Sequence, residues 1–196
     1  MKTIMTGLCL IALLATTATT ATAAPVQALV NDEEANWGFF IRPELKITPI
    51  KSQTTELAGG ILGTSVGRAL YLGVGGYTLV NSVNADSGAL KLKAFDIWYA
   101  GAHADYTLFS TKLFHGSLSG FLGGGQVNNS SSSAGSESAN LFIAEPDVNL
   151  EFNLTSTLEL GVGIGYRFVN GSDLDKLSNS DLSSWVGTVF FRWTEG

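Results

Sequence analysis

The sequence predicts an all-β fold, an eight-stranded antiparallel up-and-down transmembrane β-barrel. Three observations favour this fold class. Apolar and polar residues alternate along several segments, and only a strand places successive side chains on opposite faces. The segments run for roughly 11 to 14 residues, longer than the usual strand of five or six and long enough to cross the hydrocarbon of a bilayer. The connections between them alternate between short turns and longer polar loops.

Composition excludes several classes of protein. The 196 residues include 23 glycines, 4 prolines and one cysteine, and 45% are hydrophobic but only 14% charged. Intrinsic disorder requires low hydrophobicity with high net charge, and a coiled coil requires Glu/Lys-rich heptads. The formal charge of −6 gives no basic surface for binding nucleic acid. The length suits one domain.

The first 23 residues have the features of a cleaved secretory signal peptide. Lys2 supplies the positive charge, 7–15 form an apolar core, and 21–23 (ATA) form a small-x-small cleavage site. The apolar core is well short of the ~20 residues that a membrane-spanning helix needs. We therefore expect 24–196 to form one barrel domain. Cys9 leaves with the signal peptide, so this domain has no thiolate for a disulfide, a nucleophile or a metal.

Eight segments are expected to be strands. The first places Phe39 and Ile41 on one face and Arg42 and Glu44 on the other. The apolar faces end in aromatic residues, where the interfacial girdles of a membrane barrel would lie. These aromatic residues are Trp37, Phe39, Trp98, Tyr106, Tyr166, Phe168, Trp185 and Trp193. The expected strands are 37–49, 54–67, 70–82, 94–109, 116–128, 139–154, 158–170 and 184–194.

The second and third segments are the least regular. Gly59, Gly63 and Gly67 lie four apart, a spacing that also fits a small-xxx-small transmembrane helix. However, the stretch 58–80 contains seven glycines, which weaken any helix. A hairpin that turns at 67–69 fits the rest of the chain better.

The last three segments alternate most clearly. The sixth has Phe142, Val148 and Leu150 on one face, and the seventh has Leu160, Val162 and Ile164. Acidic residues and glycines lie opposite them. The eighth places Trp185, Val189, Phe191 and Trp193 opposite Thr188 and Arg192. One apolar and one polar face per strand is the pattern that a barrel in lipid requires.

The lengths of the connections indicate how the barrel is oriented. The links after the second, fourth and sixth strands are short, namely 68–69, 110–115 and 155–157. The links after the third, fifth and seventh are longer and polar, namely 83–93, 129–138 and 171–183. An even number of strands with short turns at one end is typical of bacterial outer-membrane barrels. This layout predicts that both termini lie in the periplasm.

A family resemblance lies in the segment LELGVGIGYRF at 158–168 and in the aromatic final strand at 185–193. Together with the architecture of the whole mature chain, they make it similar to the small eight-stranded bacterial outer-membrane β-barrels of the OmpA/OmpX/OmpW-like group. Such chains usually end on Phe or Trp, whereas Thr194, Glu195 and Gly196 follow Trp193 here. The resemblance implies an outer-membrane protein that contacts lipid and is recognised by the barrel-assembly machinery through its C-terminal strand. We expect a monomer whose longer loops meet any extracellular partners.

Charged residues on the inward faces are the main candidate site. Paired and hydrogen-bonded charges are tolerated in an interior just wide enough for side chains to fill. We therefore interpret them as a structural network that fills the lumen. A narrow pore or a small hydrophobic-ligand conduit is the alternative, and its acidic excess would favour cations. The expected network comprises Arg42, Glu44, Lys46, His103, Asp105, Glu145, Asp147, Glu151, Glu159, Arg167 and Arg192.

A third possibility is a lipid-modifying hydrolase that uses His103 and Asp105. A histidine and an aspartate two apart on one strand face could act as base and orienting group beside a serine. Because this pair points into the lumen, away from lipid, we expect no catalysis. His115 falls in a short turn and is expected to be solvated. The glycine runs at 73–76 and 123–125 lack the helix that phosphate binding needs, and we expect no cofactor and no metal site. The predicted function is that of an integral outer-membrane protein with a structural or surface-interaction role.

Overall fold

A computed structural model of the chain describes residues 36–50, 53–80, 95–129, 137–171 and 178–195. The expected signal peptide, 1–23, lies outside the described residues. So do most of the three longer loops. The following account concerns the described ranges.

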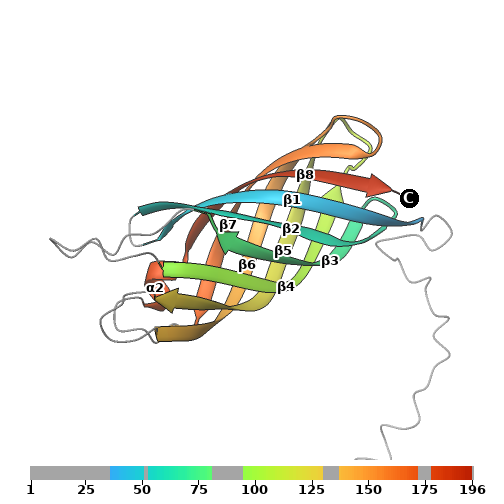
Figure 1. Cartoon of the computed structure of the whole chain (residues 1–196). Helices are drawn as coiled ribbons and strands as arrows, with labels where there is room; N and C mark the ends of the chain where they lie inside the picture. Colours follow the sequence, from blue (N-terminus) through green and yellow to red (C-terminus); the bar gives the residue numbers. More distant parts are fainter. Residues whose placement is uncertain (1–35, 51–52, 81–94, 130–136, 172–177, 196) are drawn as a thin grey trace, which may run out of the picture.

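Eight strands form a closed barrel (Figure 1). Each pairs antiparallel with its neighbour in sequence, and the last pairs with the first. This confirms the predicted fold class, and the predicted strand bounds differ from the observed ones by at most three residues. The strands are β1 Trp37–Ile50, β2 Gln53–Val66, β3 Leu70–Leu79, β4 Phe95–Leu108, β5 Phe114–Asn129, β6 Glu137–Asn153, β7 Leu158–Asn170 and β8 Ser184–Glu195, with a short helix, α2 Asn179–Leu182, before β8.

The stretch 58–80 forms the β2–β3 hairpin, which excludes the alternative helix. Its register pairs Val66 with Leu70 at the turn and Leu57 with Leu79 at the far end. No described helix is both long and apolar enough to cross a bilayer.

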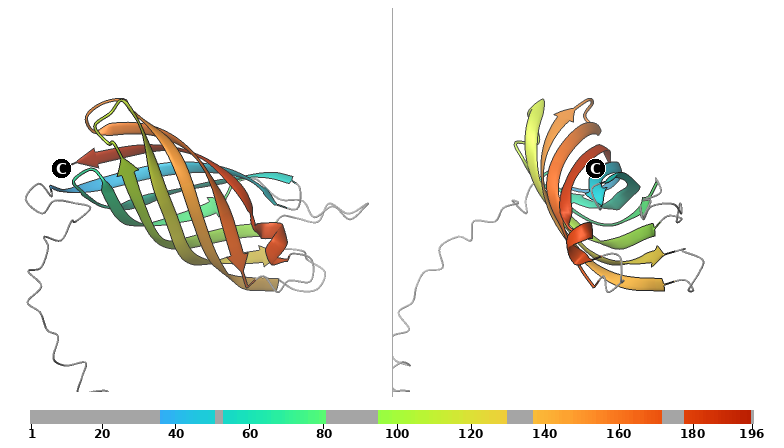
Figure 2. Two further views of the ribbon diagram at one scale, coloured as in Figure 1. Left: turned by 180° about the vertical axis from the view of Figure 1, so that it is seen from behind. Right: turned by 90° about the vertical axis from the view of Figure 1, so that its left-hand side faces the viewer.

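The two ends of the barrel differ. The start of β1 and the end of β8 lie together, since Phe39 pairs with Glu195. The turns at 67–69, 109–113 and 154–157 lie at this same end, which we call the turn end. α2 lies at the opposite end, which we call the loop end (Figure 2).

The outer surface of the barrel is apolar. Trp37 is 66% exposed and Trp185 is 63% exposed, and aliphatic side chains fill the middle of the strands. The alternation predicted this apolar outer face, since every second residue along a strand points outward. Exposed examples from several strands are Ile41, Leu62, Val74, Leu122, Val148, Leu150, Val162, Ile164 and Phe168.

The inner surface is layered along the barrel axis, as the inward residues of β1 show. From the turn end to the loop end they read Phe40, Arg42, Glu44, Lys46, Thr48 and Ile50, all buried. Phe40 packs with Ile61 and Tyr71 in a small cluster at the turn end. At the loop end a larger cluster, which we call the apolar layer, closes around Ile50. It consists of Ile50, Leu57, Tyr77, Ile97, Tyr99, Phe121, Val127, Leu141, Ile143, Val169 and Leu182.

Glycine makes room for large inward side chains. Gly161 on β7 pairs with Phe190 on β8, and a Cβ at Gly161 would collide with the Phe190 ring. Phe190 in turn lies under the Arg42 guanidinium, whose Cζ is 3.6 Å from the ring centroid. Because Gly161 has no side chain, the Phe190 ring fits against β7 and the Arg42 guanidinium stacks on that ring inside the lumen.

Candidate functional site: the charged interior

Buried ion pairs occupy the lumen between the two apolar clusters. We call these side chains the charged layer. Each belongs to a strand residue whose side chain points into the lumen. Ion pairs within 4.0 Å connect them, some within β1 or between adjacent strands and others across the barrel. The charged layer consists of Arg42, Glu44, Lys46, Asp105, His115, Glu145, Glu151, Glu159, Arg167 and Arg192.

Arg192 is the most heavily paired cation of the layer. Its side chain has no exposed surface. Nε donates to Glu159 Oε2 at 2.6 Å, Nη1 donates to Asp105 Oδ2 at 3.2 Å, and Nη2 donates to Glu151. The Tyr71 ring lies below the guanidinium, 4.0 Å from Cζ. One cation thus compensates carboxylates from three other strands.

Arg42 links the Arg192 group to the rest of the layer. Its Nη1 donates to Asp105 Oδ2 at 2.8 Å, so both arginines share one carboxylate oxygen. Its Nε lies 2.5 Å from Glu44 Oε1. Glu44 then accepts a hydrogen bond of 2.5 Å from the Tyr77 hydroxyl, which belongs to the apolar layer.

Lys46 forms the centre of a second group nearer the loop end. Nζ donates to Glu145, lies 3.7 Å from Glu44 Oε2, and sits 3.9 Å from the centroid of the Tyr77 ring. The other oxygen of Glu145 lies 3.6 Å from Arg167 Nε. Asp147 shares the inward face of β6 and is half-buried, but it makes no ion pair with any described residue.

His103 and Asp105 do not form a catalytic pair. His103 Nε2 lies 3.4 Å from Arg42 Nη1, and no hydroxyl in the described ranges hydrogen-bonds to the imidazole. The Ser117 hydroxyl, on the neighbouring strand, instead donates to Glu151 at 2.7 Å. A nucleophile must contact its base, so the geometry does not favour the hydrolase alternative.

The expectation that His115 is solvated was wrong. β5 begins at Phe114, two residues earlier than predicted, and this places His115 at the inward parity. Its side chain is fully buried, with Nε2 3.0 Å from Glu151 Oε2 and Nδ1 3.1 Å from the Lys112 carbonyl oxygen. The signal that could have found it is its even spacing from Ser117 and Ser119, which also face inward.

His115, Glu151 and Glu159 form a group with metal-ligand chemistry. One ligand atom from each lies within 4.8 Å of the others. However, the Arg192 guanidinium donates to both carboxylates. A cation supplied by the chain therefore already compensates these carboxylates, and a divalent ion would face its repulsion.

Side chains fill the lumen on the loop side of the charges. The rings of Tyr77, Tyr99 and Phe121 come from three adjacent strands, with centroids 5.0 to 5.6 Å apart. Leu182 of α2 packs into the same layer and is 2% exposed. Ion conduction needs a polar path, and this layer is apolar, so the packing does not favour the pore alternative. Sequence reasoning missed this layer. The apolar residues at inward parity near the strand ends, such as Ile50, Leu57 and Ile97, were the signal for it.

Solved structures of other proteins resemble this chain, and one of them aligns with a TM-score above 0.5. No family model matches the chain, and no curated protein matches it. Among solved structures, Neisserial surface protein A (NspA) aligns with a TM-score of 0.60 at 11% identity, covering 81% of this chain and 97% of that one. Ail, the attachment invasion locus protein of Yersinia pestis, aligns with a TM-score of 0.48 at 12% identity, covering 83% of this chain and 99% of Ail. A major outer membrane protein from Thermus thermophilus aligns with a TM-score of 0.49 at 8% identity, covering 81% of this chain and 99% of that one. At this identity the likeness is one of fold.

Proposed function

We propose that the chain is an integral outer-membrane β-barrel protein with a structural or surface-interaction role and no catalytic activity. The observation that carries this proposal is the distribution of side chains in the barrel, which is the reverse of that in a water-soluble protein. Large apolar side chains cover the outside, while charges are buried within. Water-soluble proteins rarely expose apolar patches larger than a few hundred Å². In a closed barrel every strand is also hydrogen-bonded along both edges, which the interior of a bilayer requires.

The dimensions and the ends of the barrel support the same proposal. The strands contain 10 to 17 residues, and about 9 to 11 tilted residues span the hydrocarbon. Tryptophans at exposed strand ends, such as Trp37 and Trp185, suit the interfacial girdles. In this proposal the turn end faces the periplasm, and the loops at 83–93, 129–138 and 171–183 face outside. NspA, the structure with the TM-score of 0.60, is itself described as a surface protein.

The charged layer then has a structural role, that of a plug. Several ion pairs couple strands that are distant in sequence, such as β1 to β4 through Arg42 and Asp105 and β1 to β6 through Lys46 and Glu145. Such pairs are strong in a dry interior only when their hydrogen bonds are complete. The plug fixes the barrel cross-section, and in this proposal the three longer loops are the surface for interactions.

Fractionation tests the proposal directly. We expect the protein to remain with the outer-membrane fraction after carbonate washing, to require detergent for extraction, and to show heat-modifiable gel mobility. Recovery as a folded protein without detergent would contradict it. In planar bilayers the folded barrel should give no conductance steps.

A matched pair of substitutions separates lipid exposure from water exposure. Val148 on β6 and Leu113 in the turn at 109–113 are each 57% exposed. In a membrane, Val148→Arg places a charge near the middle of the hydrocarbon and costs about 2–4 kcal/mol of folding free energy in lipid vesicles, whereas Leu113→Arg costs about 1 kcal/mol or less. Equal tolerance of the two changes would indicate a barrel surrounded by water.

A further inference from the structure

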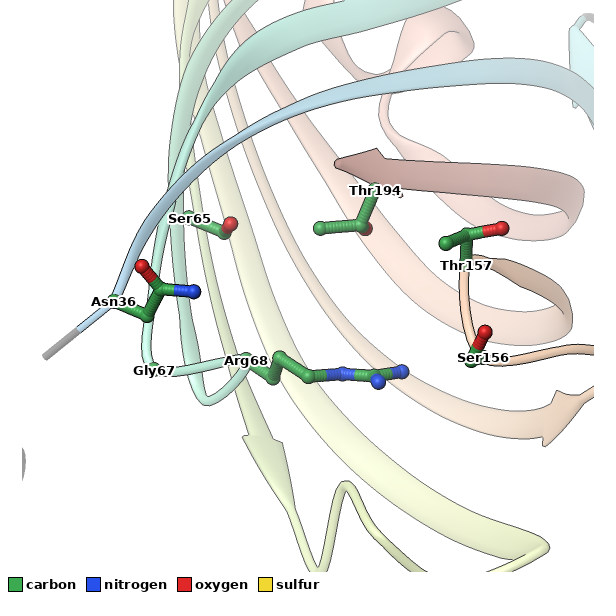
Figure 3. A pocket seen from close by; sticks show the side chains of 7 residues that line it. All are labelled: Asn36, Ser65, Gly67, Arg68, Ser156, Thr157 and Thr194. Carbon is green, nitrogen blue, oxygen red and sulfur yellow. The ribbon is translucent and has the colours of Figure 1, made fainter. Parts of the chain in front are cut away.

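A polar cavity of about 230 Å³ opens at the turn end of the barrel (Figure 3). It lies between the turn that joins β2 to β3 and the turn that joins β6 to β7. The side chains around it carry a guanidinium, four hydroxyls, of which that of Thr194 is buried, and a carboxamide, and none of them is acidic. They belong to Asn36, Ser65, Arg68, Ser156, Thr157 and Thr194.

The β2–β3 turn directs the Arg68 side chain into this cavity. Gly67 and Arg68 both have positive φ, 60° and 55°, as the two central residues of a type I′ turn do. The left-handed region suits glycine and asparagine, and it is unfavourable for arginine. A strained non-glycine residue that persists at a cavity is grounds for a functional hypothesis. The guanidinium of Arg68 extends across the cavity towards Ser156 (Figure 3).

The walls of the cavity are fixed by backbone hydrogen bonds. Gly67 N–H donates to the Asn36 carbonyl at 3.0 Å, and Thr194 N–H donates to the Thr157 carbonyl at 2.8 Å. The Thr155 hydroxyl accepts from the N–H groups of Thr157 and Leu158, at 3.2 and 2.9 Å. The backbone that carries the donors is therefore held in place before any ligand arrives, which lowers the entropic cost of binding.

The Thr194 side chain lines the cavity without supplying a donor to it. Thr194 is 8% exposed, and its hydroxyl oxygen is buried. The hydroxyl lies beside the Tyr71 phenol, where a solute in the cavity does not reach it.

Arg68, in contrast, keeps free donor capacity. Within the described ranges its ion pair joins Nη2 to Glu159 Oε1 at 3.5 Å, which is longer than a strong charge-assisted hydrogen bond. Glu159 is held more closely by Arg192, at 2.6 Å. Arginine has five N–H donors in a planar fork that matches carboxylate and phosphate groups. The side chain is 41% exposed, so a solute can reach it.

We propose that this cavity binds a small oxyanion, a carboxylate or phosphate group, between the Arg68 guanidinium and the Ser156 hydroxyl. The volume suits such a group with a short tail. The proposal does not depend on the membrane location argued above, which decides only that the ligand would come from the periplasmic side.

The test is an NMR titration of the folded, isotope-labelled barrel in detergent micelles. The probes are inorganic phosphate and acetyl-alanyl-alanine, which offers a peptide carboxylate. Ionic strength is held constant with chloride. We expect saturable shifts at the Arg68 Nε–H and at the amides around 65–68, 156–157 and 194. Saturation by only one probe supports the proposal and assigns the ligand class.

Substitutions test which side chains are responsible. Arg68→Gln should weaken binding at least about tenfold, because it removes the charge and the fork, and Arg68→Lys should retain part of the affinity. Ser156→Ala, which removes only the hydroxyl, should weaken binding about three- to tenfold, the effect of one neutral hydrogen bond. Lys112→Gln is the matched control, since Lys112 is an exposed cation in another turn at the same end and does not line the cavity.

Three results would overturn the proposal. They are shifts that never saturate, shifts that persist unchanged in Arg68→Gln, and an equal loss in Lys112→Gln. The spectrum of each variant without ligand shows whether the barrel is folded, so a folding failure is distinguished from a binding failure.

Discussion

The two halves of the lumen fill the same barrel cross-section by opposite means. Towards the turn end, the charged layer joins strands through ion pairs whose geometry selects particular partners. Towards the loop end, the apolar layer joins them through contact area, to which any side chain of suitable size contributes. A buried charge without its partner is far more costly than a missing methyl group. The two halves should therefore respond to substitution in different ways.

The largest effect is expected at Arg192. Arg192→Met keeps most of the side-chain volume but leaves Glu159, Asp105 and Glu151 without their shared cation. Breaking a buried pair in this way costs about 3–5 kcal/mol. We expect that loss in the free energy of unfolding, measured by urea titration in lipid vesicles.

A second variant shows whether the loss comes from the charge. Adding Glu151→Gln to Arg192→Met removes one of the carboxylates that lost its arginine partner. The double variant should recover about 1 kcal/mol or more of the free energy of unfolding. Lys112→Gln, at an exposed cation, should change the free energy by less than about 0.5 kcal/mol. If the double variant is the sum of its parts, the charged layer is not a coupled network.

The next effect is expected in the apolar layer, where the response should follow volume. Ile97 is 2% exposed and packs in this layer. Ile97→Ala should cost about 3 kcal/mol and Ile97→Val about 1 kcal/mol, because each removed methyl group leaves a proportionate cavity. The same urea titration measures both. Equal losses for the two variants would mean that packing does not set the stability of this half.

The contrast between the halves also explains what the sequence could and could not predict. The two-residue period identifies the inward residues, so Arg42, Glu159 and Arg192 are expected in the lumen from their spacing alone. Their partners depend on the register between strands, which joins Arg42 of β1 to Asp105 of β4. That register is set by the whole closed barrel and cannot be read from one segment.

Strand ends are where the predictions were weakest. His115 was misplaced because hydrogen bonding extends β5 two residues beyond its clear alternation. The apolar layer was missed because inward apolar residues such as Ile50 and Ile143 look like breaks in a polar face. The turn at 67–69 was predicted, but the cavity beside it depends on the neighbouring 154–157 turn, which is distant in sequence.

A smaller effect is expected where a glycine permits the aromatic–cation stack. Gly161→Ala would place a methyl group against the Phe190 ring, and overpacking of this kind costs about 1–3 kcal/mol. Phe190→Leu in the same chain should relieve part of the loss. Gly120→Ala is the matched control, because a Cβ there meets nothing within 4 Å. Equal destabilisation by the two alanines would point to backbone effects in place of the collision with Phe190.

The smallest effect is expected at α2, which connects the loop end to the apolar layer. Ser178 caps this helix, its hydroxyl accepting from Asp181 N–H at 3.3 Å while Ser178 N–H donates to the Asp181 carboxylate at 2.9 Å. Ser178→Ala should cost about 1 kcal/mol locally. Because Leu182 is the helix residue that enters the lumen, the loss should appear as faster hydrogen exchange at 179–183, with little change in global unfolding. Ser138→Ala, an exposed serine near the same end of β6, should leave this exchange unchanged. If Ser178→Ala instead lowers global stability as much as Ile97→Ala, then α2 is an integral part of the apolar layer, and that half of the lumen depends on specific hydrogen bonds as the charged half does.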